Sequence, residues 1–141
     1  MCIVCYLYMY ADMGYARSRL LDLEFRDGLL NSYHYISSFD EDKTMTNTEQ
    51  LKQVQRGASK KSGVPQILGK PHGMARCPSH DFDFKDKCGK GAEIWIWTMM
   101  GKVSTFGAAY GSAQVATYNI FIVFDREGVV TDMESSQTQN E

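Results

Sequence analysis

Two cysteines near the middle of the chain have the most predictable chemistry. Cys77 and Cys88 flank a segment that also holds Pro78, Gly89 and Gly91, residue types that favour loops. In an oxidising compartment the two sulfur atoms could form a disulfide that fixes this loop, whereas in a reducing compartment both would remain thiols. Closing so short a loop would contribute on the order of 2–3 kcal/mol to stability. We expect the disulfide if the protein is exported.

Zinc binding is the alternative chemistry for the same loop. Cys77, His80 and Cys88 could serve as ligands, with Asp81 or Asp83 nearby. A closed structural zinc site uses four ligands at regular spacing, and only three nitrogen or sulfur ligands are present in this segment. We therefore predict no metal site and no cofactor.

The other cysteines and the histidines form no catalytic motif. Cys2 and Cys5 make a Cys-x-x-Cys pair inside a predicted strand, where positions i and i+3 face opposite sides. The redox form of that motif needs a helix N-terminus. The chain has three histidines, His34, His72 and His80. None of them has a Ser, Cys or carboxylate partner at the spacing of a known catalytic motif. We expect a protein that is not an enzyme.

Aromatic residues on predicted strands are the second prominent set. The set comprises Tyr6, Tyr8, Tyr10, Tyr33, Tyr35, Trp95 and Trp97. Helices packed on a sheet would bury such residues, but the sequence provides two groups of strands and only one pair of helices. An uncovered sheet face is an apolar patch of the kind that marks an interface, and Tyr and Trp dominate such contacts. We expect this aromatic surface to mediate oligomerisation or to bind a protein partner.

Strand patterns occupy both ends of the chain. Near the N-terminus they predict strands over residues 3–10, 20–25 and 29–36, with a tight turn at Asp27-Gly28 between the last two. Toward the C-terminus they predict strands over 93–98 and 117–124 and a last strand starting at Val129. The polar residues 135–141 predict a frayed tail.

The middle of the chain predicts two short helices. Thr46 and Glu49 fit a capping box at the start of the first helix, and Gly57 suits its end. The second helix is predicted over 63–68, where Pro65 falls in the first turn, and Gly69 ends it.

Composition places the chain among globular proteins. It has 141 residues, of which 43% are hydrophobic and 23% charged. These values exclude a disordered or fibrous chain. The net charge of -2 disfavours nucleic-acid binding, because general nucleic-acid binders are basic. The apolar start, residues 1–10, is too short to span a membrane.

The two groups of strands resemble each other. Residues 21–30 parallel residues 120–130, with a turn one residue longer in the second segment. Upstream, the strand that holds Tyr6 parallels the strand that holds Trp95. The pattern predicts one structural unit used twice, with helices only before the second copy.

One ordered set of residues spans the predicted helices and the C-terminal strands. It is Gly57-x-Ser59-x-x-x-x-Val64-x-x-x-Leu68-Gly69-x-Pro71, then Trp95-x-Trp97, then Ile122-x-Phe124-x-x-x-Gly128-x-Val130. This set resembles the SmpA/OmlA (BamE-like) outer-membrane lipoproteins, whose unit is two helices followed by a three-stranded antiparallel sheet. The duplicated unit also resembles the β-lactamase inhibitory protein, which uses two such repeats.

The resemblance implies an α+β fold with two short helices packed on antiparallel sheet. A truncated three-strand unit (1–38) and a polar linker (39–48) would precede a BamE-like ααβββ unit (49–135) and a polar tail (136–141), all in one compact domain.

The resemblance also implies a non-enzymatic protein-interaction module of the bacterial cell envelope. The expected partners are a second copy in a homodimer or another envelope protein, with no nucleic acid and no membrane span. A periplasmic or outer-membrane location follows, although the chain shows no signal peptide or lipobox, which leaves the cytoplasm open. Two alternatives remain: an enzyme inhibitor like the β-lactamase inhibitory protein, or a small-ligand binder or enzyme with a pocket lined by His72, His80 and nearby carboxylates.

Overall fold

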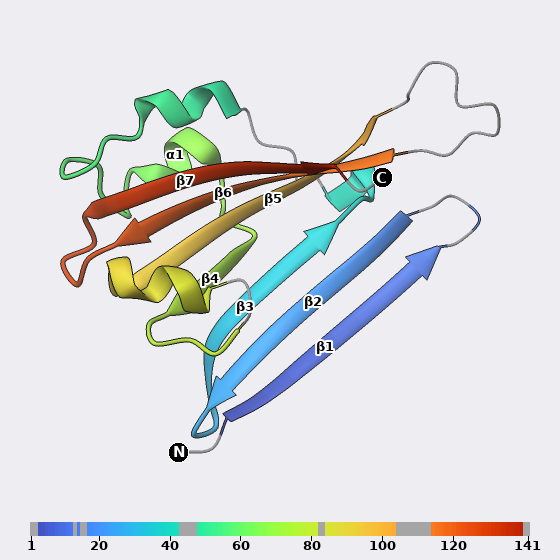
Figure 1. Ribbon diagram of the computed structural model, residues 1–141, viewed down its shortest axis with the longest axis horizontal. Coiled ribbons are helices and arrows are strands. Elements are labelled where there is room, and N and C mark those ends of the chain that lie inside the picture. The colour runs from blue at the N-terminus through green and yellow to red at the C-terminus, as the bar shows by residue number, and fades with distance from the viewer. Residues whose placement is uncertain are drawn as a thin grey trace.

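One antiparallel sheet of seven strands dominates the protein (Figure 1). The computed structural model describes residues 3–12, 14, 17–42, 48–81, 84–103 and 114–139. Each strand pairs with the strand that follows it in the chain, so the sheet is a continuous meander. The strands are β1 (Ile3–Asp12), β2 (Arg17–Arg26), β3 (Leu29–Ser37), β4 (Gly73–Arg76), β5 (Glu93–Val103), β6 (Gln114–Phe124) and β7 (Val130–Gln139).

Helical structure is limited to short turns, so the predicted α+β fold with two packed helices is wrong and the protein is β-rich. The turns are α1 (Val64–Leu68) and the 3-10 segments η1 (Asp40–Asp42), η2 (Thr48–Gln53) and η3 (Lys85–Lys90). Gly63 and Gly69 flank α1, and an isolated helix of this length is unstable in water without tertiary packing. Thr46 of the expected capping box lies outside the described residues. Within the described ranges, no helix has the length and apolarity needed to cross a membrane.

Several strands extend further than the sequence pattern predicted. β7 includes residues 135–139, which were expected to fray, because the long strand β6 supplies backbone partners as far as the Ala116–Gln139 pair. β5 likewise continues through 101–103, beyond the strand predicted over 93–98 and into a segment, residues 101–111, that is rich in Gly, Ala and Ser and was expected to form a loop or an irregular edge. The remaining residues of that segment lie outside the described residues.

The short strand β4 joins two three-stranded meanders into one sheet. It pairs with β3 over three residues and with β5 over four. The sequence did not predict this strand, because four residues are too few to show an alternating pattern. Gly73 lies where β4 has no room for a side chain: a Cβ there would lie 2.5 Å from the carbonyl oxygen of Tyr33 and 2.7 Å from Cγ2 of Ile96.

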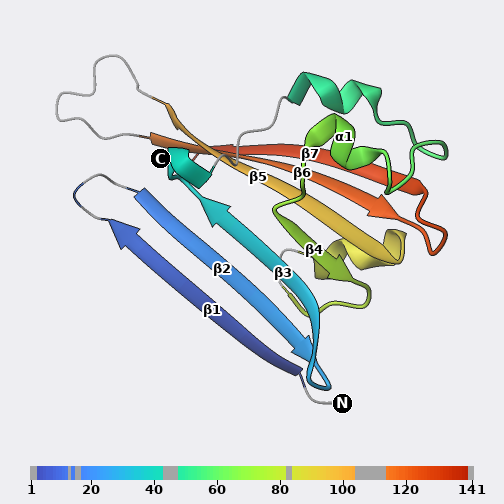
Figure 2. The same cartoon turned by 180° about the vertical axis from the view of Figure 1, so that it is seen from behind.

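The two faces of the β5–β6 region are covered by different segments. On the helical face, Val54, Val64 and Leu68 pack over Trp97 and its neighbours on β5 and β6. The opposite face, which we call the loop face, is covered by the loop that holds Phe84, just before η3. Phe84 packs there on the side chains of β5 and β6 that point away from the helical face: Ile94, Ile96, Phe121 and Val123. Figures 1 and 2 show this arrangement from opposite sides.

The two meanders match in backbone detail. β2–β3 has a register shift between Glu24 and Phe25, and β6–β7 has one between Val123 and Phe124. The tight turns after these bulges both use glycine at positive φ, Gly28 at 81° and Gly128 at 81°. The sequence similarity of the two segments is therefore accompanied by a matching bulge and a matching glycine, whereas the first turn is shorter and also holds Asp27 at positive φ.

Replacing Gly73 by alanine should strain the junction between the meanders. We expect Gly73→Ala to lower the free energy of unfolding by roughly 1–3 kcal/mol, because the new methyl group overlaps backbone atoms that cannot easily move. Urea denaturation measures this change. The matched control is Gly89→Ala, because a Cβ at Gly89 meets no atom within 4 Å. Equal stabilities of the two variants would contradict the role given to β4.

Candidate functional site

The tyrosines predicted for an interaction surface lie on one face of the N-terminal meander. Tyr6 is opposite Leu23 on β2, which in turn is opposite Tyr33 on β3. Tyr8, Leu21 and Tyr35 form the next such row. Because residues directly opposite in a sheet share a face, these side chains form one layer. We call this layer the open aromatic surface, and its members are Tyr6, Tyr8, Tyr10, Leu21, Leu23, Phe25, Tyr33 and Tyr35.

Trp95 and Trp97 belong to the same sheet face but not to the open aromatic surface. Trp97 is fully buried, and its indole Nε1 donates a hydrogen bond of 3.2 Å to the backbone oxygen of Gly69. Trp95 is 8% exposed and packs edge-on against Phe124. The helical segments cover this part of the face, so the two tryptophans form core and do not contribute to an exposed interaction surface.

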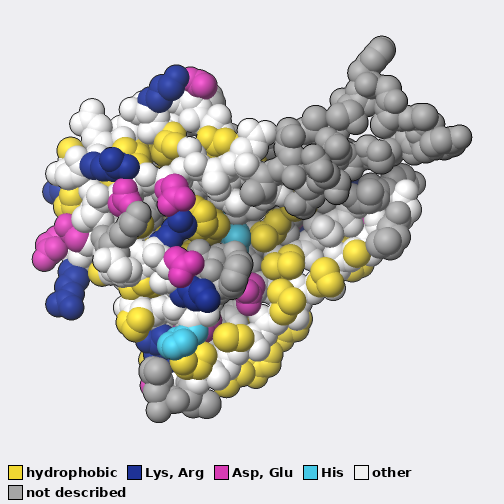
Figure 3. All heavy atoms as spheres, in the orientation of Figure 1, with side chains coloured by type: hydrophobic (Ala, Val, Ile, Leu, Met, Phe, Trp, Pro, Cys, Tyr) yellow, Lys and Arg dark blue, Asp and Glu magenta, His cyan; other side chains and the backbone are white. Residues whose placement is uncertain are grey.

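β1 exposes apolar side chains on both of its faces. Tyr8 is 58% exposed on the open aromatic surface, whereas Leu7 and Met9 are 63% and 71% exposed on the loop face. Val4, Tyr6 and Tyr10 are also exposed. Figure 3 shows hydrophobic side chains following this edge of the molecule, along the lower right of the view. The sequence analysis predicted that the tyrosines contribute to an interaction surface, but it missed Leu7 and Met9. Their exposure could not be predicted without knowing that β1 is at the edge of the sheet.

An ionic cluster fixes the end of the open aromatic surface. Asp42 accepts hydrogen bonds from Arg19 Nε at 2.6 Å, from Tyr35 Oη at 2.7 Å and from Ser37 Oγ. The Arg19 guanidinium and the two hydroxyl groups hold the pKa of the Asp42 carboxyl well below its usual range. The Arg19 guanidinium also lies 4.0 Å from the ring centroid of Phe39. Tyr35 is therefore held in one position at the edge of the surface.

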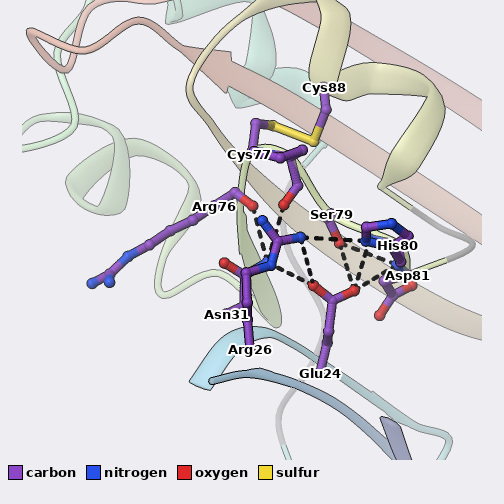
Figure 4. The surroundings of a disulfide bond; sticks show 10 residues. Glu24, Arg26, Asn31, Arg76, Cys77, Ser79, His80, Asp81 and Cys88 are labelled. Carbon is purple, nitrogen blue, oxygen red and sulfur yellow. Dashed lines mark hydrogen bonds and ion pairs between the residues drawn. A yellow bond between two sulfur atoms is a disulfide. The ribbon is translucent and has the colours of Figure 1, made fainter. Parts of the chain in front are cut away.

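A buried carboxylate attaches the long loop after β4 to the sheet. Glu24 on β2 is fully buried, and its Oε2 accepts backbone hydrogen bonds from His80 and Asp81, both at 2.8 Å (Figure 4). Its other oxygen accepts a bond of 2.7 Å from Asn31 Nδ2 and lies 3.7 Å from Nη2 of Arg26. These donors satisfy a charge that would otherwise be costly to bury.

The internal repeat in the sequence contains a signal for this buried carboxylate, which we call the Glu24 anchor. Glu24 and Val123 both lie immediately before the bulge of their meander and are both buried. The first unit thus has a carboxylate where the second has an apolar core residue. A charge at a repeated core position indicates a specific buried partner.

Cys77 and Cys88 form a disulfide at the base of this loop, the pair that the sequence suggested. The bond links the end of β4 to η3 and lies beside the Glu24 anchor (Figure 4). A shallow depression next to it is lined by loop residues and by the turn before β7: Cys77, Pro78, Cys88, Gly89, Gly91, Ala92, Asp125 and Arg126. Within the described residues no group of three or more His, Cys, Asp or Glu side chains could hold a metal ion.

The histidines do not converge on a pocket. His80 is exposed and its Nδ1 lies 3.3 Å from Arg26, whereas the Nδ1 of His72 lies 2.9 Å from the backbone nitrogen of Thr98. Burial lowers the pKa of His72, which favours the neutral ring that accepts this N–H. His34 Nε2 lies 2.8 Å from Oγ1 of Thr98. His34 and His72 thus bridge β3 and β5 at the N-terminal end of β4, which is a structural role.

The Asp42 cluster predicts a specific pH dependence. In the unfolded chain the Asp42 carboxyl titrates near 3.8, and in the native protein its pKa is lower. Its stabilisation is therefore complete above the unfolded value and is lost as the pH falls toward the native pKa. The difference in free energy of unfolding between the wild type and Asp42→Asn should shrink as the pH falls below about 4. A difference that stays constant in acid, measured by urea denaturation, would contradict this assignment.

The disulfide predicts distinct cysteine reactivities. Without reductant, Cys77 and Cys88 should resist alkylation, whereas the free and exposed Cys5 should react and serves as the internal control. Peptide mass spectrometry measures both. The Cys77→Ser/Cys88→Ser variant should lose on the order of 2–3 kcal/mol of stability, because its unfolded chain is less constrained. Alkylation of Cys77 and Cys88 before reduction would refute the bond.

Comparisons with known proteins returned no relative. No family model, no curated protein and no solved structure matches the chain. The geometry of the sheet and its exposed edge is therefore the basis for assigning a function.

Proposed function

We propose that this chain is a non-enzymatic protein-interaction module whose N-terminal meander binds another protein chain. The observation that carries the proposal is the concentration of exposed large hydrophobic side chains on β1 and on the start of β3. They are Val4, Tyr6, Leu7, Tyr8, Met9, Tyr10, Leu29 and Leu30. Contiguous apolar surface of this kind marks interaction sites on soluble domains.

The contrast between the two meanders supports this assignment. Among the described residues, the buried clusters that cover β5 and β6 include helical and loop segments but no residue of β1 or β2. The open aromatic surface occupies the same sheet face on which α1 packs further along. A protein partner on β1–β3 would remove from water the apolar side chains that correspond to those already buried on β5–β6.

A cell-envelope location is part of the proposal. The Cys77–Cys88 disulfide is typical of an oxidising compartment, such as the bacterial periplasm. The resemblance of residues 57–71, 95–97 and 122–130 to the BamE-like lipoproteins points the same way. Both the compartment and a role similar to that of the BamE-like lipoproteins are hypotheses supported by these residues.

The first partner we propose is a second copy of the chain. Light scattering coupled to size-exclusion chromatography, over a concentration series, should give a mass that rises from 16.0 kDa toward twice that value. The expected reason is burial of apolar side chains from β1–β3. A mass of 16.0 kDa up to high micromolar concentration would exclude self-association.

A further inference from the structure

We propose that β1 pairs antiparallel with β1 of a second copy about a two-fold axis, so that two seven-stranded sheets become one continuous sheet. The inference rests on the proposed function, because it assigns the partner and the geometry of the same surface. It specifies contact through the strand edge, whereas the general proposal would also allow face-to-face packing of the open aromatic surface.

The chemistry of the two outer strands favours β1 as the pairing edge. β1 and β7 are the first and last strands of the sheet. Residues 3–11 of β1 contain no charged side chain and no proline. β7 presents Asp132 and Glu134, which form ion pairs with Arg56 and Lys87. Charges on an edge strand oppose pairing with another chain, whereas a long uncharged edge favours it.

The internal repeat shows that a strand of this type accepts neighbours on both sides. Tyr6 is opposite Leu23 in the first meander as Trp95 is opposite Ile122 in the second, so β1 corresponds to β5. β5 is paired with β6 on one side and with β4 on the other. Within the described part of the chain, β1 is paired in the sheet with β2 alone. A second strand beside β1 would give it the environment that β5 already has.

The exposure of both faces of β1 favours a strand as the occupant rather than a covering layer. A layer packed on the open aromatic surface would cover Tyr8 but leave Leu7 and Met9, on the opposite face, in water. A strand added at the edge places neighbouring side chains beside β1 on both faces at once. The exposures of 63% and 71% at Leu7 and Met9 are then reduced together with the exposure of Tyr8.

The uncharged segment fixes the register. Antiparallel pairing of all of residues 3–11 with the same residues of a second copy places Leu7 on the two-fold axis. Leu7 then faces Leu7 of the partner subunit, and Tyr6 faces Tyr8 of the partner subunit. Every pair in this register is uncharged, and an isologous contact of this kind closes as a dimer. The nine residue pairs would exchange about nine backbone hydrogen bonds.

Opposite charges at Leu7 provide the sharpest test. We expect Leu7→Lys alone and Leu7→Glu alone to weaken the dimer at least about tenfold, because like charges then face each other across the axis. An equimolar mixture of the two variants should restore the mass of a dimer in light scattering. The matched control is Gln137→Lys on the exposed part of β7, which should dimerise like the wild type.

Cysteine cross-linking tests the register independently. In a Cys2→Ser/Cys5→Ser background, Leu7→Cys should form a covalent dimer under mild oxidation, because residues directly opposite in antiparallel strands have Cα separations that a disulfide can bridge. Gln137→Cys in the same background should remain monomeric on a non-reducing gel. A covalent dimer from Gln137→Cys and none from Leu7→Cys would place the interface on β7 and overturn the proposal.

The remaining outcomes separate this inference from the proposed function. If Leu7→Lys and Leu7→Glu both dimerise like the wild type while Tyr33→Ser, on β3, does not, the open aromatic surface packs face to face. The edge pairing is then wrong and the protein-interaction function stands. If the wild type is monomeric at every concentration, edge pairing is wrong and so is self-association. Failure of the mixture to restore the dimer also overturns the two-fold axis at Leu7.

Discussion

The structure depends on a very short pairing between β3, β4 and β5. Among the residues that the structure describes, the ladder between β3 and β4 has three residue pairs, from Ser32–Ala75 to His34–Gly73. Gly73 permits the close backbone approach at one end, and His72 extends it, because its backbone bonds to both Tyr35 and Ile96. The same junction decides which strands become edges. By placing β4 between β3 and β5, it leaves β1 as the outermost strand of the sheet.

The two meanders use one geometry for different purposes. In the second, the apolar residues of β5 and β6 are buried by α1, η2 and the loop around Phe84, and they form the core. In the first, the positions on β1 that correspond to Trp95 and Trp97 hold Tyr6 and Tyr8, which tolerate water, and the core position before the bulge holds Glu24. Glu24 binds the backbone of the disulfide loop, so polar contacts stabilise this unit while its apolar side chains stay accessible.

Sequence patterns predicted the strands of both meanders because alternation is a local property, and the turn at Asp27-Gly28 has a local signature. They placed the second helix correctly to within a residue, since α1 is Val64–Leu68 with Pro65 in its first turn and Gly69 after it. They were wrong about the first helix, whose place is taken by the 3-10 segment η2. They could not reveal β4, whose pairing depends on distant backbones. The tyrosines of the surface were foreseeable from residue type, but the burial of Trp95 and Trp97 was not, since it depends on where the helical turns pack.

The asymmetry between the two sheet edges limits what the proposed assembly can become. Pairing of β1 with β1 of the partner subunit consumes the uncharged edge of both copies and leaves β7 at each end of the combined sheet. Asp132 and Glu134 on that strand, with their partners Arg56 and Lys87, place charged side chains at both ends, so a further copy meets a charged edge. A head-to-tail contact between β1 and β7 would instead extend without closure. The charges on β7 therefore favour a closed dimer over a filament. In such a dimer the uncharged edges of both β1 strands are paired with each other, so neither edge is left free to start aggregation.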